Sequence, residues 1–334
     1  MMKNSRFLLN PHPDSSASSI NSSRTALRIS IITPSYNQAA YLEQTIQSVL
    51  DQDYPNIEYI VIDGASTDGS VEIIRKYQDK LAYWVSEEDS GQAEAINKGF
   101  ARATGEIIAW LNSDDYYLPN AVSAAVRILE ENSDVVFVYG NMLAVDAHGK
   151  TFNIMKYKQL TIEDFLCFQI IGQPAVFMRR STLQQTGRLH PTFHFLLDHL
   201  LWIQLAQRGR ILHIPQIWSA ARYHADAKNR AKAAEFGREA FRILETVAKD
   251  ESLAPILSKV TRRARASAHR VDARYLLDGG QSVAALSAWM RALFIHPPTA
   301  LARMNIFMSA VLNLLGLGGI REGILHVRDA SYRK

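Results

Sequence analysis

Residues 31–70 read IITPSYNQAAYLEQTIQSVLDQDYPNIEYIVIDGASTDGS, and this stretch decides the fold class. The segment 28–34 is a short β-branched run, which predicts a buried strand. Apolar residues then recur at helical spacing over 41–51, and a second apolar run, 57–62, stops abruptly at Asp63. A strand, a helix and a strand in succession predict two parallel strands joined by a right-handed crossover.

The same alternation continues through the next part of the chain. A helix is predicted to start near Ser66–Gly69, and the segments beyond it alternate between strand and helix patterns: 81–85, 93–103, 106–111, 120–131 and 135–139. Strands and helices of this size predict an α/β fold with a mostly parallel sheet flanked by helices. We expect a flexible serine-rich leader at 1–26, an α/β domain at 27–230 and an α-helical C-terminal region at 231–334.

The composition is that of a globular protein, with 47% hydrophobic and 21% charged residues among 334. A net charge of +4 is mild and predicts no nucleic-acid partner. Cys167 is the single cysteine, which excludes an internal disulfide and fits a reducing compartment. The leader has no apolar core of the secretory kind, and no uninterrupted apolar run is long enough to span a bilayer. We therefore expect a cytoplasmic protein.

Polar residues follow three of the predicted strands, at Thr33–Tyr36, Asp63-Gly64 and Asn112–Asp115. In open parallel sheets, ligands bind beyond the carboxyl ends of the strands, so these three loops predict one binding site. No G-x-G-x-x-G motif or P-loop follows any of these strands. A dinucleotide-binding fold and a P-loop nucleotidase are therefore not indicated.

Asp114 and Asp115 are adjacent acids at the end of a strand, and their negative charges repel each other. A hard divalent cation would offset this repulsion, because Mg²⁺ and Mn²⁺ use one or two protein carboxylates and complete their shell with water and phosphate oxygens. Asp115 is predicted as the metal ligand, with Asp114 reaching a ribose hydroxyl or a metal-bound water. Taken alone, such a pair is more often a solvated turn.

Three segments in fixed order resemble one known family. They are 31–70, DSGQAEAINKGFARATGEIIAWLNSDDYYLP at 89–119 and LDHLLWIQLAQRG at 197–209. Together they are similar to the family two glycosyltransferases with the GT-A fold, over roughly 28–230. The resemblance implies a GT-A sheet, a nucleotide-diphosphate sugar donor, a Mn²⁺ or Mg²⁺ ion, and transfer of one sugar with inversion.

The resemblance also assigns roles to particular residues. The donor site would be formed by residues of the first four strand ends: Pro34 and Tyr36 at the base, Asp63 on a base ring nitrogen, Gln92, Asn97 and Lys98 along the nucleotide-sugar, Asp114 at the ribose and Asp115 at the metal. Plainer interpretations are open for several of them. Tyr36 would otherwise be a packing ring, Asp63 a turn residue, and Lys98 a solvated surface lysine.

Three further positions match the family outside that loop cluster. Asp198 matches the catalytic base that removes the proton of the acceptor hydroxyl. His224 matches a histidine that reaches the metal or the diphosphate, and Gln173 lies where acceptor contacts are expected. On spacing alone Asp198 would be a helix-capping acid and His224 an ordinary loop residue.

The sequence departs from the commonest family pattern at two positions. Asn112 replaces an aspartate, and Gly64 replaces a second acid after Asp63. Both changes bear on the identity of the donor more than on activity. The Gln-x-x-Arg-Trp signature of processive polysaccharide synthases is absent, so we expect a single addition.

The expected function is therefore metal-dependent sugar transfer to a glycan, glycolipid or protein acceptor, in synthesis of a bacterial surface polysaccharide or glycoconjugate. Two alternatives stay open: a nucleotidyltransferase, which would carry a glycine-rich basic loop after the first strand, and a non-catalytic scaffold acting through its helical tail. The apolar and basic residues of 304–334 predict contact with the inner face of the plasma membrane. Packing of the same helices on the protein is the alternative.

Overall fold

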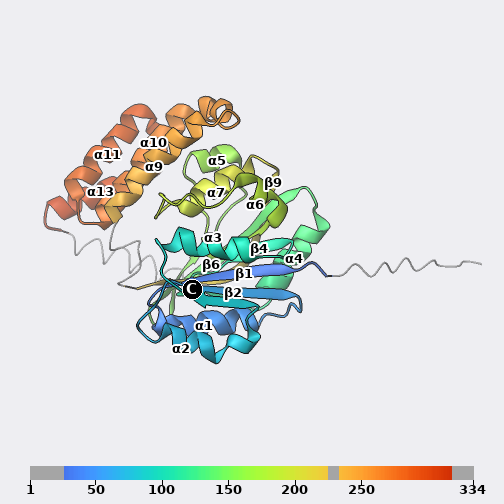
Figure 1. The fold of residues 1–334 in the computed structure, drawn as a ribbon. Coiled ribbons are helices and arrows are strands. Elements are labelled where there is room, and N and C mark those ends of the chain that lie inside the picture. Colours follow the sequence, from blue (N-terminus) through green and yellow to red (C-terminus); the bar gives the residue numbers. More distant parts are fainter. Residues whose placement is uncertain (1–25, 225–232, 318–334) are drawn as a thin grey trace, which may run out of the picture.

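The computed structural model describes residues 26–224 and 233–317 and contains one nine-stranded sheet (Figure 1). The strand order is β3-β2-β1-β4-β8-β6-β9-β5, with β7 paired to β6. The first four strands along this order are parallel: β3 (Tyr83–Ser86), β2 (Ile57–Asp63), β1 (Ile29–Ser35) and β4 (Ile107–Trp110). The predicted mostly parallel α/β sheet is confirmed.

The second half of the sheet is mixed. β8 (Val176–Arg179) is antiparallel to both β4 and β6 (Val135–Asp146), while β9 (Arg210–Tyr223) runs parallel to β6. The short β5 (Tyr116–Tyr117) and β7 (Thr151–Met155) complete it. The sequence prediction ended the strand that begins at 135 at Tyr139, whereas β6 extends to Asp146. β6 continues because Gly140, where a Cβ atom would lie 2.6 Å from the Trp218 ring, lets β9 pack closely against it.

Two hydrophobic clusters cover the two faces of the sheet. One joins α1 (Ala39–Leu50), α2 (Ser70–Lys76) and α4 (Ala121–Glu131) to the sheet. The other joins α3 (Gln92–Arg102), α5 (Ile162–Leu166), α6 (Arg180–Thr186) and α7 (Leu197–Ala206) to it. Figure 1 shows α1 and α2 below the sheet and α3, α5 and α7 above it. Side chains of β1 alternate between the two clusters, as the pleat of a strand buried on both faces requires.

The C-terminal region is helical, as predicted from 231 onward. Its helices are α9 (Ala233–Lys249), α10 (Ala254–Asp278), α11 (Ser282–Ile295), α12 (Pro297–Leu301) and α13 (Met304–Leu314). In Figure 1, α9, α10, α11 and α13 lie at the upper left, beside α5 and α7. The cluster beneath α7 extends without a break into α9 and α10, through side chains such as Phe236 and Val271. These two helices therefore share one core with the α/β part.

The last described helix, α13, packs on α11 through Ile306 and Ala310 and leaves several apolar side chains exposed: Met304, Met308, Leu314, Leu315 and Leu317. No helix in residues 26–224 and 233–317 is long and apolar enough to cross a bilayer. Most of the predicted leader, the proposed boundary at 230, and the basic end of the 304–334 segment lie outside the described residues.

Candidate active site

A cavity of about 1680 Å³ opens at the carboxyl ends of the parallel strands. Its walls include the loops after β1, β2 and β4, the end of β9, the start of α7, and residues of α9, α10 and α13. Of the predicted site residues, eight line it: Pro34, Tyr36, Gln92, Asp114, Asp115, Gln173, Asp198 and His224. Segments that are far apart in the sequence therefore meet where parallel sheets bind their ligands.

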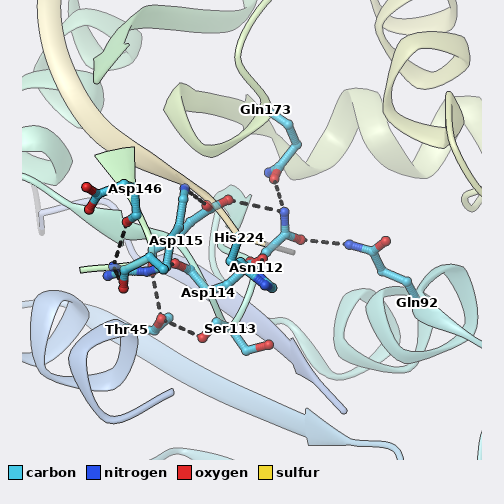
Figure 2. Close-up of polar contacts among 11 residues, drawn as sticks. Thr45, Gln92, Asn112, Ser113, Asp114, Asp115, Asp146, Gln173 and His224 are labelled. Carbon is cyan, nitrogen blue, oxygen red and sulfur yellow. Dashed lines mark hydrogen bonds and ion pairs between the residues drawn. The ribbon is translucent and has the colours of Figure 1, made fainter. Parts of the chain in front are cut away.

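Asn112 is the centre of an amide network in this cavity (Figure 2). Its Oδ1 accepts a hydrogen bond from Gln92 Nε2 at 2.8 Å, and its Nδ2 donates to Gln173 Oε1 at 3.2 Å. Nδ2 also lies 3.3 Å from Asp115 Oδ2. An amide accepts and donates at once, whereas an ionised carboxylate only accepts. An asparagine in place of the family's aspartate therefore suits its neighbours, because it can accept from Gln92 and donate to Gln173.

Asp115 is turned into the protein. Its carboxylate is part of a side chain only 5% exposed, and Oδ1 accepts the backbone N–H of Arg222 at 2.9 Å. Thr45 Oγ1 donates to the backbone carbonyl of Asp115 at 2.6 Å. Burial and the nearby charge of Asp114 raise the pKa of Asp115 well above its usual range. Through these contacts Asp115 links the loop after β4 to β9.

Asp114 faces the other way and meets His224. Its Oδ2 lies 3.1 Å from His224 Nε2, and the imidazole packs against the Tyr41 ring at a centroid distance of 4.9 Å. His224 Nδ1 is buried and has no hydrogen-bond partner among the residues that the structure describes. The pair thus brings one carboxylate and one imidazole together on the cavity wall.

The buried side chain of Arg222 holds the loop after β4 in place. Arg222 donates from Nε to the carbonyl of Asp114 at 3.1 Å and from Nη1 to the carbonyl of Ala147 at 3.0 Å. Its guanidinium also lies over the Tyr41 ring, 4.7 Å from the centroid. These contacts occupy the guanidinium group, so Arg222 orients Asp114 and is not a free phosphate ligand. Its position beside His224 was the only signal in the sequence.

Another part of the cavity is lined by an aromatic ring and an acid, Tyr36 and Asp89. Tyr36 is 64% exposed and lines the wall together with Pro34. A Cβ atom at Gly64 would lie 2.8 Å from Asp89 Oδ2 and 3.3 Å from the Tyr36 ring. Glycine therefore permits an acid and an aromatic ring to come close together here. Asp89 was not predicted, and its carboxylate is fixed by the N–H of Gly91 at 2.7 Å.

Asp63, which the family resemblance assigned to the base, lies away from the cavity in this structure. Its side chain is 0% exposed and does not line the cavity. Oδ2 accepts from Ser66 N at 2.9 Å and from Ser86 Oγ at 2.7 Å, and Oδ1 accepts from Ser66 Oγ at 2.6 Å. Both oxygens are occupied, so Asp63 holds the turn after β2 against β3.

Two residues of α3 that were predicted to contact the donor also lie away from the cavity. Asn97 exchanges two hydrogen bonds with the backbone of Leu189, at 2.8 and 2.9 Å. Lys98 forms ion pairs with Glu87 at 2.9 Å and Glu94 at 3.2 Å. Neither lines the cavity, because only the first turn of α3, with Gln92, points toward it.

Asp198 lies in the first turn of α7 and is half-buried on the cavity wall. Burial raises the pKa of its carboxyl to about 6. The chain entering α7 is held from α9, because the Glu239 carboxylate accepts the N–H groups of three consecutive residues, His194, Phe195 and Leu196, at 2.7–2.8 Å. A carboxylate with this pKa is mostly ionised at neutral pH and can accept a proton.

Comparison with known proteins assigns the chain to a family. The profile described as "Glycosyl transferase family 2" matches residues 30–187. The putative teichuronic acid biosynthesis glycosyltransferase TuaG of Bacillus subtilis is 34% identical over 186 residues, which are 54% of this chain and 73% of that protein. The uncharacterized glycosyltransferase alr2836 of Nostoc is 36% identical over 130 residues, 38% of this chain and 40% of its own length.

Solved structures share the fold. Mannosyltransferase PcManGT from Pyrobaculum calidifontis, in complex with GDP-Man and Mn²⁺, superposes with a TM-score of 0.59 at 19% identity, covering 93% of this chain and 89% of its own. Residues 1–349 of S. aureus TarS, in complex with UDP-GlcNAc, give 0.57 at 16% identity, with 86% and 92% covered. The chain belongs to glycosyl transferase family 2 and is a glycosyltransferase with the GT-A fold.

Proposed function

We propose that this enzyme transfers one sugar from a nucleoside-diphosphate donor to an acceptor hydroxyl, with inversion at the anomeric carbon. The observation that carries the proposal is the convergence of Asp114, His224 and Asp198 on one cavity from three separate elements. An inverting transfer has two separate requirements: a base for the attacking hydroxyl and stabilisation of the leaving diphosphate. Asp198 would meet the first requirement and Asp114, beside His224, the second.

Asp198 would act as the base. Its carboxylate removes the proton of the acceptor hydroxyl while that oxygen attacks the anomeric carbon and the nucleoside diphosphate departs. The pKa of about 6 keeps the group ionised at neutral pH and still basic enough to take the proton. Its place in the first turn of α7, held by the contact with Glu239, would fix the line of attack.

We propose that a divalent Mn²⁺ or Mg²⁺ ion binds at Asp114 and His224, which differs from the sequence-based choice of Asp115. Asp114 and the imidazole supply oxygen and nitrogen donors that face each other, and His224 has a further buried nitrogen without a described partner. No group of three or more histidine, cysteine or acidic side chains suited to a metal was found in residues 26–224 and 233–317. A two-donor site leaves positions for phosphate oxygens and water, as Mg²⁺ prefers. When bound, the ion would neutralise charge on the leaving diphosphate.

The base of the nucleotide would bind between Tyr36 and Asp89. Stacking on the exposed Tyr36 ring is worth about 1–3 kcal/mol. Asp89 replaces Asp63 as the proposed acceptor for a ring N–H, because its carboxylate borders the cavity beside Tyr36. Gln92 and Gln173, both linked to Asn112, would lie along the donor sugar and the acceptor.

The setting we propose is assembly of a bacterial envelope polysaccharide or glycoconjugate, on the cytoplasmic side. The support is the name of the Bacillus subtilis relative, which refers to teichuronic acid biosynthesis. The exposed apolar side chains of α13 support contact with the membrane surface. Flotation with anionic vesicles tests this contact: Met308→Asp should lower the bound fraction, and equal binding of the variant and the original chain would contradict it.

The function is tested by screening a panel of nucleotide-sugars for hydrolysis with Mn²⁺, with Mg²⁺ and with chelator. We expect slow, metal-dependent release of one nucleoside diphosphate, and loss of that release in Asp114→Ala. Release that is unaffected by chelator would contradict the metal role, and no release or binding of any donor would contradict the proposed transfer. Membership of the family already weighs against the nucleotidyltransferase alternative.

A further inference from the structure

One wall of the cavity is made by the helices that follow the α/β part. Arg270 and Arg274 of α10 line it, together with Arg303 immediately before α13. Burial, with the charges of Arg303 and Arg274, lowers the pKa of Arg270 to about 10. The charges of two neighbouring guanidinium groups therefore disfavour the charged form of the buried Arg270, which costs free energy unless negative charge is near.

Among residues 26–224 and 233–317, ion pairs supply little of that negative charge to the three arginines. Arg274 pairs with Asp278 at 3.2 Å, and Arg270 donates to the carbonyl of Phe168 at 2.9 Å. Within the described part of the chain, no carboxylate lies within ion-pair distance of Arg270 or Arg303. Lys156 and Lys158 line the same cavity and add to the positive charge.

This wall lies on the Asp198 side of the cavity. An aromatic stack connects the two: the Phe236 ring lies 4.8 Å from Phe195, which is three residues before Asp198, and 4.0 Å from Tyr275, which follows Arg274. Burial raises the pKa of Tyr275 to about 12. The charge of Arg274 opposes this rise and the charge of Asp198 adds to it, so both side chains act on the Tyr275 phenol. The proposed base pocket at Tyr36 and the Asp114–His224 pair line the same cavity.

Resting on the proposed function, we propose that Arg270, Arg274 and Arg303 bind a negatively charged group of the acceptor, so that the acceptor is an anionic glycan or glycolipid. An acceptor hydroxyl must lie beside Asp198 to be deprotonated, and a phosphate or carboxylate on the same molecule would then reach the arginine wall. Guanidinium groups bind both anions through paired N–H donors, so the shared chemistry is an oxyanion.

The test measures probe binding by calorimetry with saturating Mn²⁺ and the nucleoside diphosphate that the donor screen identifies. The probes are decyl phosphate and tetragalacturonate, each with a neutral counterpart, decyl glucoside and maltotetraose. We expect at least one anionic probe to bind more tightly than its counterpart, and Arg303→Gln and Arg270→Gln each to weaken it about ten-fold or more. Preference for decyl phosphate would indicate a lipid-linked phosphate, and preference for tetragalacturonate an acidic sugar.

Arg265→Gln is the matched control, because Arg265 is exposed on the same helix and does not line the cavity. It should bind every probe as the original chain does. Arg270 also bonds to Phe168, so Arg303→Gln, whose guanidinium has no described partner, keeps the test valid if the other variant unfolds.

Three results would overturn the proposal. They are anionic probes that bind no better than neutral ones, anionic binding unchanged in both arginine variants, and a matching loss of nucleoside-diphosphate binding in those variants. The last result would assign the arginines to the donor. Donor hydrolysis by the original chain is measured in parallel, so failure of the proposed function is recognised separately.

Discussion

Glu239 is the residue through which the C-terminal helices should control catalysis. It is 4% exposed, and its two oxygens accept three backbone N–H groups just before the helix that carries Asp198. In Glu239→Gln, one oxygen becomes an NH₂ group that faces backbone donors. Hydrogen bonds to a charged group contribute about 1.5–3 kcal/mol, so we expect the free energy of unfolding to fall by about 2 kcal/mol. In Glu239→Ala all three N–H groups lose their acceptor, and we expect a loss of about 3–5 kcal/mol.

The assay combines urea unfolding with donor and acceptor kinetics at fixed metal concentration. Glu239→Gln should lower kcat for transfer more than it weakens donor binding, because the displaced group is the base and not the nucleotide pocket. Glu235→Gln is the control, since this acid is exposed on the same helix. If Glu239→Gln unfolds and turns over like the original chain, Glu239 does not position Asp198.

Three further predictions concern the cavity. Because burial raises the pKa of Asp198 to about 6, kcat/KM should fall about ten-fold per pH unit below that value. The raised pKa also means that stability falls as the pH rises from about 4 to about 6 and stays at the lower level above pH 6. Asp198→Asn should therefore be inactive yet more stable by about 2 kcal/mol at pH 8, with little gain at pH 4, measured by urea unfolding at the two pH values. Gly64→Ala should raise the donor KM several-fold with little change in stability, because its Cβ would lie 2.8 Å from Asp89 Oδ2; an unchanged KM would remove this pocket from donor binding. Asn112→Asp should destabilise by about 1–3 kcal/mol, because a carboxylate cannot donate to Gln173 and would repel Asp115; urea unfolding at neutral pH checks this.

The periodic segments allowed the sheet to be predicted. Strands β1 to β4 and their helices have strong patterns, and their ends matched the structure to within a few residues. The antiparallel β8 and the long β9 were not predicted, because their neighbours in the sheet are distant in sequence and their apolar residues do not alternate clearly. The continuation of β6 depends on Gly140 and Trp218, a contact that spacing does not reveal.

The sequence indicated which loops line the cavity, but not which way individual side chains in those loops point. Adjacent residues in an extended loop point in opposite directions, so Asp114 and Asp115 could not be told apart without the contacts of Arg222 and His224. Asp63 was placed in the donor site by the family resemblance, and its position at the end of a strand fitted a turn residue equally well. Whether a strand-end acid faces the ligand or the protein depends on partners such as Ser86, which lies on the neighbouring strand.

The most direct test of the account compares metal-dependent donor binding in two neighbouring variants. Calorimetry would measure nucleoside-diphosphate affinity with Mn²⁺ and with chelator for Asp114→Asn and Asp115→Asn, after circular dichroism shows that each is folded. We expect Asp114→Asn to abolish the gain in affinity that Mn²⁺ provides, while Asp115→Asn keeps most of that gain. Loss of the Mn²⁺ effect in Asp115→Asn alone would return the metal to Asp115 and contradict the proposed site.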